Sequence, residues 1–116
     1  MKVIIYTRVS TAEQTTENQL AVLQKWVAER GHTLVEVYSE KESAWKSGCQ
    51  HELKRLFEGL RLRKADICLI WSLDRLTREG ISAILQLVDR FKRYGVRVIS
   101  FQESWTEAPG EMADLL

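Results

Sequence analysis

Two short segments carry the residue types that could do chemistry on a phosphate. The first, Tyr6-Thr7-Arg8-Val9-Ser10-Thr11, directly follows the apolar run Val3-Ile4-Ile5 and places a hydroxyl nucleophile two residues after a guanidinium. The second, Leu73-Asp74-Arg75-Leu76-Thr77-Arg78, follows another apolar run and adds a carboxylate and two arginines. Arginines around a serine fit attack on a phosphodiester, because the extra negative charge of that transition state needs cations already in place. The two segments together predict a phosphate-handling site.

The sequence lacks the motifs of three other kinds of site. No GxSxG turn surrounds a serine and neither His32 nor His51 lies near a predicted strand end, which disfavours acyl transfer. A GxxxxGK[ST] phosphate loop is absent. The histidines and the lone Cys49 and Cys68 have no partners at metal-ligand spacing, and Cys68 in its apolar run is expected to be a buried hydrophobe. We therefore expect chemistry that uses side chains alone.

Length and composition fit one folded domain. The chain has 116 residues, of which 45% are hydrophobic and 28% charged, with Pro 1 and Gly 6. No apolar run approaches the roughly 18–20 residues of a membrane span, and no export signal opens the chain, so a cytoplasmic protein is expected. A net charge of +1 is too small for a stand-alone nucleic-acid binder. If DNA is the substrate, another part of the protein must hold it.

Strand-like and helix-like runs alternate along the chain. β-branched and aromatic residues predict four strands, over Lys2–Tyr6, Thr33–Tyr38, Asp66–Trp71 and Val96–Phe101. Three helices between them are predicted by apolar residues at spacings of three and four, namely Leu20, Leu23 and Val27, then Leu53, Leu56, Phe57 and Leu60, then Ile81, Ile84, Leu85, Val88 and Phe91. Gly31 and Gly95 stand where helix C′ glycines belong. This alternation predicts a three-layer α/β fold around a mainly parallel sheet of four or five strands.

A strand order of 2-1-3-4 would bring the two segments together. Ligands of such sheets bind beyond the carboxyl ends of the strands, where the strand order reverses, and Ser10 would lie there beside the arginines of both segments. Arg78 is expected in the first turn of a helix over 77–94, where the helix dipole disfavours a cation unless an anion is near. Other roles stay open: Arg78 as a solvated surface residue, Ser10 as a turn or helix cap, and Asp74 as an orienting carboxylate, a proton carrier or a cap.

The chain resembles a known family. Tyr6-x-Arg8-Val9-Ser10-Thr11-x-x-Gln14, followed by Leu73-Asp74-Arg75-Leu76-x-Arg78, is similar to the N-terminal catalytic domain of the serine recombinases, the group of resolvases, invertases and transposon integrases. The likeness runs over essentially the whole chain. It implies that Ser10 attacks a DNA phosphodiester to give a 5′-phosphoseryl link and a free 3′-hydroxyl, without metal, ATP or another cofactor. It also implies that Arg8, Arg75 and Arg78 bind and polarise the phosphate, with Asp74 beside the leaving oxygen or the arginines.

A supporting set and one departure follow from the same resemblance. Residues that would assist phosphate binding are Tyr6, Gln14, Gln19 and Ser43, although Thr16-x-x-Gln19 also fits a capping box. Many members carry an arginine at the position that is Gln50 here, and Lys46 could supply a charge from the same loop. The departure leaves a second interpretation, a resolvase-like assembly or regulatory module with weak or no catalysis.

The resemblance also sets expectations for organisation and partners. The family fold ends in a long helix that carries the dimer interface and leads to a separate DNA-binding domain. We therefore expect a catalytic domain over residues 1–110, with residues 111–116 as the start of that helix, cut within it, and no DNA-binding domain in this chain. The implied partners of the full-length protein are double-stranded DNA and further copies of itself, as a dimer and as a tetramer in the synaptic complex. A bacterial, DNA-associated location away from membranes would follow.

Overall fold

The fold is an alternating series of strands and helices. In a computed structural model of the chain, the described residues are 1–9, 15–41, 51–62, 65–73, 76, 80–103 and 106. Its elements, in order, are β1 (Lys2–Val9), α1 (Thr15–Glu29), β2 (Thr33–Lys41), α3 (His51–Leu62), β3 (Ile67–Ile70), α4 (Ile81–Arg93) and β4 (Arg97–Ser100). The first two strands run three residues beyond their predicted ends, because polar residues, Thr7 and Arg8 in β1 and Ser39 to Lys41 in β2, interrupt the hydrophobic signal.

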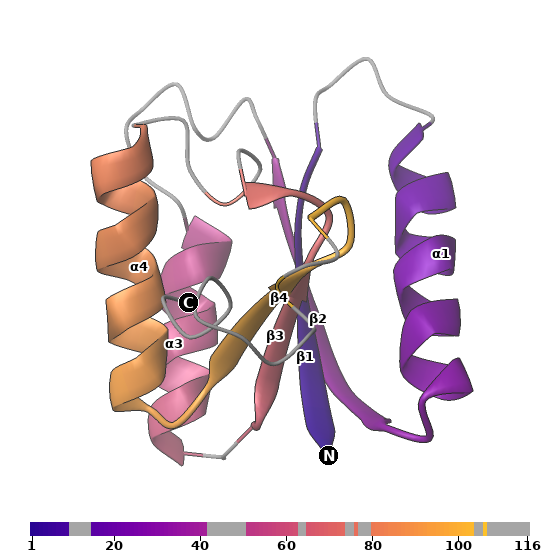
Figure 1. The fold of residues 1–116 in the computed structure, drawn as a ribbon, viewed down its shortest axis with the longest axis horizontal. Helices are drawn as coiled ribbons and strands as arrows, with labels where there is room; N and C mark the ends of the chain where they lie inside the picture. The colour runs from indigo at the N-terminus through magenta and orange to yellow at the C-terminus, as the bar shows by residue number, and fades with distance from the viewer. Residues whose placement is uncertain are drawn as a thin grey trace.

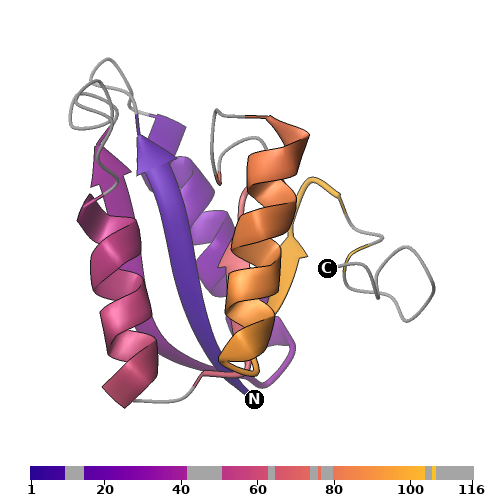
Figure 2. The same ribbon diagram turned by 90° about the vertical axis from the view of Figure 1, so that its left-hand side faces the viewer.

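The four strands form one parallel sheet in the order β2-β1-β3-β4. Helix α1 covers one face of the sheet, and α3 and α4 cover the other (Figure 1). Figure 2 shows α3 and α4 side by side in front of β1. The predicted α/β class and the predicted strand order are confirmed, and the first and third strands are neighbours.

Side chains of alternating residues fill the two layers of core. The layer between the sheet and α1 holds the buried strand residues Val3, Ile5, Ile67, Leu69 and Ile99. The layer on the other face holds the buried strand residues Ile4, Tyr6, Tyr38, Cys68, Ile70 and Val98. Strand β3 is covered on both faces, which explains its unbroken apolar sequence.

The helices bury most of the residues that their periodicity predicts. All four predicted positions of α3 are buried, as are Leu23 and Val27 of α1. On α4 the prediction is wrong for Ile81 and Leu85, which are 75% and 48% exposed. The buried side of α4 is formed instead by Val88 and Phe91, with Ile84 and Leu87 packed against the same core layer, so the apolar stripe of this helix is wider than the face that it buries. No helix in the described ranges is long and apolar enough to cross a membrane.

Helix α4 also begins later than its sequence suggests. Its N-cap is Gly80, with a φ of 98° that a non-glycine residue rarely adopts, and the Gly80 carbonyl accepts the first helical hydrogen bond from the Ile84 N–H at 3.1 Å. Arg78 therefore precedes the N-cap in the sequence, and its predicted place in the first turn of the helix is wrong. The helix ends are as predicted, with Gly31 and Gly95 at positive φ just beyond α1 and α4.

Gly59 sets the distance between α3 and β2. A Cβ atom added at this position would lie 2.8 Å from the hydroxyl oxygen of the buried Tyr38. Gly59→Ala should therefore lower the free energy of unfolding by about 1–2 kcal/mol, although alanine is the better helix former. In a Tyr38→Phe background the nearest remaining ring carbon is 3.9 Å away, so the same change should be neutral or stabilising. Urea unfolding of the wild type, the two single variants and the double variant measures this coupling, and equal effects of Gly59→Ala in both backgrounds would refute it.

Candidate active site at the carboxyl edge of the sheet

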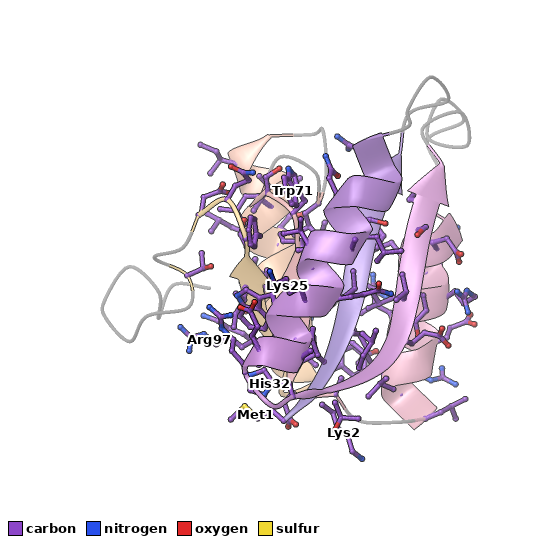
Figure 3. The ribbon with its side chains drawn as sticks, turned by 90° about the vertical axis from the view of Figure 1, so that its right-hand side faces the viewer. Met1, Lys2, Lys25, His32, Trp71 and Arg97 are labelled. Atoms are coloured by element: carbon purple, nitrogen blue, oxygen red, sulfur yellow. The ribbon has the colours of Figure 1, made fainter. Side chains whose placement is uncertain are left out.

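Because all four strands are parallel, their carboxyl ends meet at one edge of the sheet. Figure 3 shows where this edge lies: Trp71, just after β3, is at the end of the molecule opposite to Met1 and Lys2. Of the predicted site residues, Tyr6, Arg8 and Gln19 are described by the structure. The others lie outside the described residues: Ser10, Gln14, Ser43, Asp74, Arg75 and Arg78, together with Lys46 and Gln50.

Arg8 is buried at the carboxyl end of β1. The residue is 5% exposed, and its Nε and Nη1 atoms are buried. It lies two residues beyond Tyr6, which makes the last pairing of β1 with β3, opposite Ile70. Arginine keeps its charge under all ordinary conditions, and burying a charge is costly unless partners compensate it. The fold therefore holds a permanent cation at the edge where the predicted phosphate site belongs.

Glu40 faces Arg8 from the next strand and was missed by the sequence analysis. The two residues are register partners in the β1–β2 ladder, and Glu40 is 1% exposed. Its Oε2 atom accepts hydrogen bonds from the backbone N–H groups of Glu52, at 2.7 Å, and Leu53, at 3.2 Å. A carboxylate at a helix N-terminus satisfies donors that have no helical partner and interacts favourably with the helix dipole. Glu40 thus joins the end of β2, the start of α3 and the neighbourhood of Arg8.

The sequence feature that could have identified Glu40 is its spacing of two residues from Tyr38. Residues two apart in a strand point to the same face, so a buried Tyr38 implies an inward Glu40 if the strand continues. The polar run Ser39-Glu40-Lys41 predicts that the strand ends at Tyr38. The strand instead continues to Lys41, and on the opposite face the Thr7 and Ser39 hydroxyl oxygens lie 3.0 Å apart.

Tyr6 and Gln19 have different surroundings. Tyr6 is 1% exposed and belongs to the core layer beneath Arg8. Gln19 is half-buried in the second turn of α1. Because α1 begins at Thr15, Thr16 lies inside the helix and does not take the N-cap position that the capping box requires. This start of α1 argues against the capping box, and the supporting role of Gln19 beside the site stays a prediction.

The residues on either side of Asp74 and Arg75 are well anchored. Leu76 is completely buried in the core layer beneath α3 and α4. Its backbone N–H donates to the Leu73 carbonyl at 3.1 Å, so the two described residues that flank Asp74 and Arg75 are joined directly. Asp74 and Arg75 are thus attached at both ends to fixed points next to β3.

Among the described residues, other nucleophile and metal chemistry has little support. Complete burial raises the pKa of the Cys68 thiol far above its usual range, so the reactive thiolate does not form at neutral pH. The described ranges contain no group of three or more His, Cys, Asp or Glu side chains arranged to hold a metal ion. The predicted position of Cys68 as a small buried hydrophobe is confirmed.

Comparison with known proteins places the chain in a family. Residues 3–116 match the family described as Resolvase, N terminal domain, and the chain belongs to it. A resolvase of Clostridium perfringens (strain 13 / Type A) is 27% identical over 106 residues, which are 91% of this chain and 52% of that protein. The chain thus spans about half the length of this curated relative.

Solved structures agree with this assignment. The N-terminal catalytic domain of TP901-1 integrase superposes with a TM-score of 0.79 at 28% identity, covering 99% of this chain and 88% of that one. The C-terminal catalytic domain of ISC1926 TnpA, an IS607-like serine recombinase, gives a TM-score of 0.70 at 27% identity, covering 86% and 68%. A resolvase family site-specific recombinase from Streptococcus pneumoniae, at 23% identity and a TM-score of 0.74 over 90% and 74%, shares the fold. The structural neighbours of this chain are serine recombinase catalytic domains.

Proposed function

We propose that this chain is the catalytic domain of a site-specific DNA recombinase in which Ser10 is the nucleophile. The Ser10 Oγ forms a bond to a DNA phosphorus while the bond from that phosphorus to the 3′ oxygen breaks. The Ser10 hydroxyl gives up its proton and the departing 3′ oxygen takes one up, so the products are a 5′-phosphoseryl link and a DNA 3′-hydroxyl. After strand exchange, a 3′-hydroxyl attacks the phosphoserine and the reaction runs in reverse. One ester replaces another at each step, so the proposal needs no ATP, and arginine side chains supply the positive charge at the phosphate.

The observation that best supports this function is the buried Arg8 at the carboxyl edge of the sheet. Ser10 follows the last described residue of β1, Val9, and consecutive Cα atoms lie only about 3.8 Å apart. Asp74 and Arg75 are tethered in the same way between Leu73 and Leu76, beside the adjacent strand β3. Two motifs that are some 65 residues apart in the sequence are thereby attached to neighbouring strands at one edge. This juxtaposition supports a shared site.

In this site the arginines would carry the electrostatic part of catalysis. A phosphodiester has one negative charge and gains a second as the nucleophile adds, so cations already held in place favour the transition state over the ground state. Arg8 is buried and therefore fixed, and we assign it to the phosphate together with Arg75 and Arg78. Asp74 would stand by the leaving oxygen or orient the arginines. Gln14, Gln19, Ser43 and Tyr6 would support the bound phosphate.

Glu40 has a positioning role in this proposal. It holds the start of α3 and lies opposite Arg8 in register, so it sets the place of the cation relative to the end of β1. Because the Oε2 atom of Glu40 accepts two backbone hydrogen bonds, we do not assign Glu40 as the base that removes the Ser10 proton.

The partners of the full-length protein are part of the proposal. With a net charge of +1, affinity for double-stranded DNA must come mainly from outside these residues, since phosphate neutralisation supplies most of such affinity. We propose a separate DNA-binding domain, a dimer and a synaptic tetramer, with residues 1–110 as the catalytic domain and 111–116 as the start of a dimer helix. Residues 107–116 lie outside the described residues. The proposed location is the bacterial cytoplasm, on DNA.

The test is covalent capture of DNA by the full-length protein. A supercoiled plasmid that carries the DNA flanking the gene is incubated with the protein in EDTA, and the reaction is stopped with detergent. A protein–DNA adduct that resists detergent and is lost on protease treatment supports the recombinase. Stable binding of the same DNA without any adduct would favour the alternative, an assembly or regulatory module in which Gln50 replaces a needed arginine.

A further inference from the structure

Glu103 connects the ends of strands β3 and β4. Its Oε1 atom accepts a hydrogen bond from the backbone N–H of Leu73 at 2.8 Å and another from the hydroxyl of Ser100 at 3.0 Å. Leu73 immediately precedes Asp74 and Arg75, whereas Ser100 is the last residue of β4. A single carboxylate oxygen thus links the two strand ends next to the proposed phosphate site.

The turn that carries Glu103 is itself held in place. The buried Thr106 hydroxyl donates to the Glu103 carbonyl at 2.8 Å, and the Thr106 Oγ1 accepts from the Ser100 N–H at 2.8 Å. The Arg97 side chain donates to the Thr106 carbonyl. The turn after β4 is therefore a fixed support, and the Glu103 carboxylate transmits its position to Leu73.

Leu73 and Leu76, the described residues on either side of Asp74 and Arg75, are each held by contacts with the rest of the fold. On the far side of Asp74 and Arg75, Leu76 is fixed by complete burial and by its hydrogen bond to the Leu73 carbonyl. On the near side, the Leu73 N–H is fixed by Glu103. Burial of Leu76 is a property of the core, whereas the contact of Glu103 with Leu73 is a polar link that one substitution can remove without opening a cavity beneath the sheet.

We propose that Glu103 is a positioning residue that holds the Asp74–Arg78 segment at the correct distance from Arg8. This inference rests on the proposed function, because it assigns those arginines to the DNA phosphate. Errors of about 1 Å in such a constellation can lower a reaction rate by about 100-fold. Loss of the link should therefore slow strand cleavage without weakening DNA binding.

The two hydrogen bonds to Glu103 allow its role to be tested by substitution with glutamine. Both hydrogen bonds end on the same Oε1 atom, and an amide oxygen has two lone pairs that can accept both. Glu103→Gln should therefore keep the link, whereas Glu103→Ala should remove it. If Glu103 acted through its negative charge, for example by pairing with an arginine of the motif, the two variants would fail alike.

The first measurement is amide hydrogen exchange at Leu73 in the 116-residue chain, followed by NMR. We expect exchange at Leu73 to be about tenfold faster in Glu103→Ala than in the wild type, and within about twofold of the wild type in Glu103→Gln. Glu58→Ala, which changes an exposed glutamate of α3, is the matched control and should leave Leu73 unchanged. Wild-type exchange at Leu73 in Glu103→Ala would overturn the proposed link.

The second measurement separates the cleavage rate from DNA binding in the full-length protein. Glu103→Ala should lower the rate constant of adduct formation by about 10- to 100-fold, with the dissociation constant for the flanking DNA unchanged within about twofold, and Glu103→Gln should restore most of the rate. Normal cleavage by Glu103→Ala, or failure of glutamine to restore it, would overturn the positioning role. A wild-type protein that binds this DNA but forms no adduct would instead refute the proposed function. Amide exchange at Leu73 would still show whether Glu103 holds the Leu73 N–H.

Discussion

Replacing Ser10 with alanine should abolish the covalent protein–DNA adduct and leave the fold intact. The substitution removes only the oxygen that would attack the phosphorus, so the arginines stay in place with no nucleophile to assist. We expect the rate of adduct formation in the full-length protein to fall by at least about 10³-fold. Detergent-stopped reactions on the supercoiled plasmid measure the rate, and circular dichroism checks the fold.

Two controls test whether the loss of adduct is specific to Ser10 and whether the reaction is independent of metal ions. Ser82 is an exposed serine of α4, and Ser82→Ala should cleave at the wild-type rate. Wild-type cleavage should also be the same in EDTA and in magnesium, because the proposed reaction uses side chains alone. Adduct formation by Ser10→Ala, or abolition of wild-type cleavage by EDTA, would contradict the mechanism.

Glu40→Ala should be among the most destabilising single changes outside the apolar core. It leaves the part-buried N–H of Glu52 and the buried N–H of Leu53 without their acceptor and removes the buried carboxylate that is the register partner of Arg8. An unsatisfied buried polar group costs about 1–3 kcal/mol, and a lost helix cap costs a similar amount. We expect the free energy of unfolding to fall by about 2–4 kcal/mol, measured by urea titration.

Glu58→Ala is again the matched control for that experiment. The residue is an exposed glutamate on α3, and its loss should change stability by no more than about 0.5 kcal/mol. If Glu40→Ala and Glu58→Ala had equal effects, then Glu40 would not couple β2, α3 and Arg8 as we describe.

Hydrophobic periodicity was enough to predict the four strands, whereas their order was predicted as the one that brings the two polar segments to the same edge of the sheet. Strand β3 is unbroken and apolar because helices cover both of its faces, and the glycines after α1 and α4 mark helix ends that need positive φ. The same signal gave the buried face of α3 completely. It failed on α4, because periodicity registers an apolar stripe but not which part of the stripe packs on the sheet, and Ile81 and Leu85 lie outside the part that is buried.

The polar parts of the site were harder to predict. Arg8 was found because its motif is distinctive, but Glu40 and Glu103 lie in polar stretches where a buried carboxylate and a solvated one look alike. What distinguishes them is a partner far away in the sequence: the start of α3 for Glu40 and the Leu73 N–H for Glu103. Only the strand register and the turn after β4 bring those partners within reach. Ser10, Gln14, Ser43, Asp74, Arg75 and Arg78 lie outside the described residues, and their roles stay predictions.

The most direct measurement of the central claim is the chemical identity of the protein–DNA bond. The adduct is digested with nuclease and trypsin, and the peptide that retains a nucleotide is sequenced by mass spectrometry. We expect the nucleotide on the tryptic peptide of residues 9–25, at Ser10 and not at a threonine of that peptide, joined through the 5′ phosphate, with a 3′-hydroxyl on the other strand end that a polymerase can extend. A nucleotide attached to any other residue, or a link through the 3′ phosphate, would contradict the account.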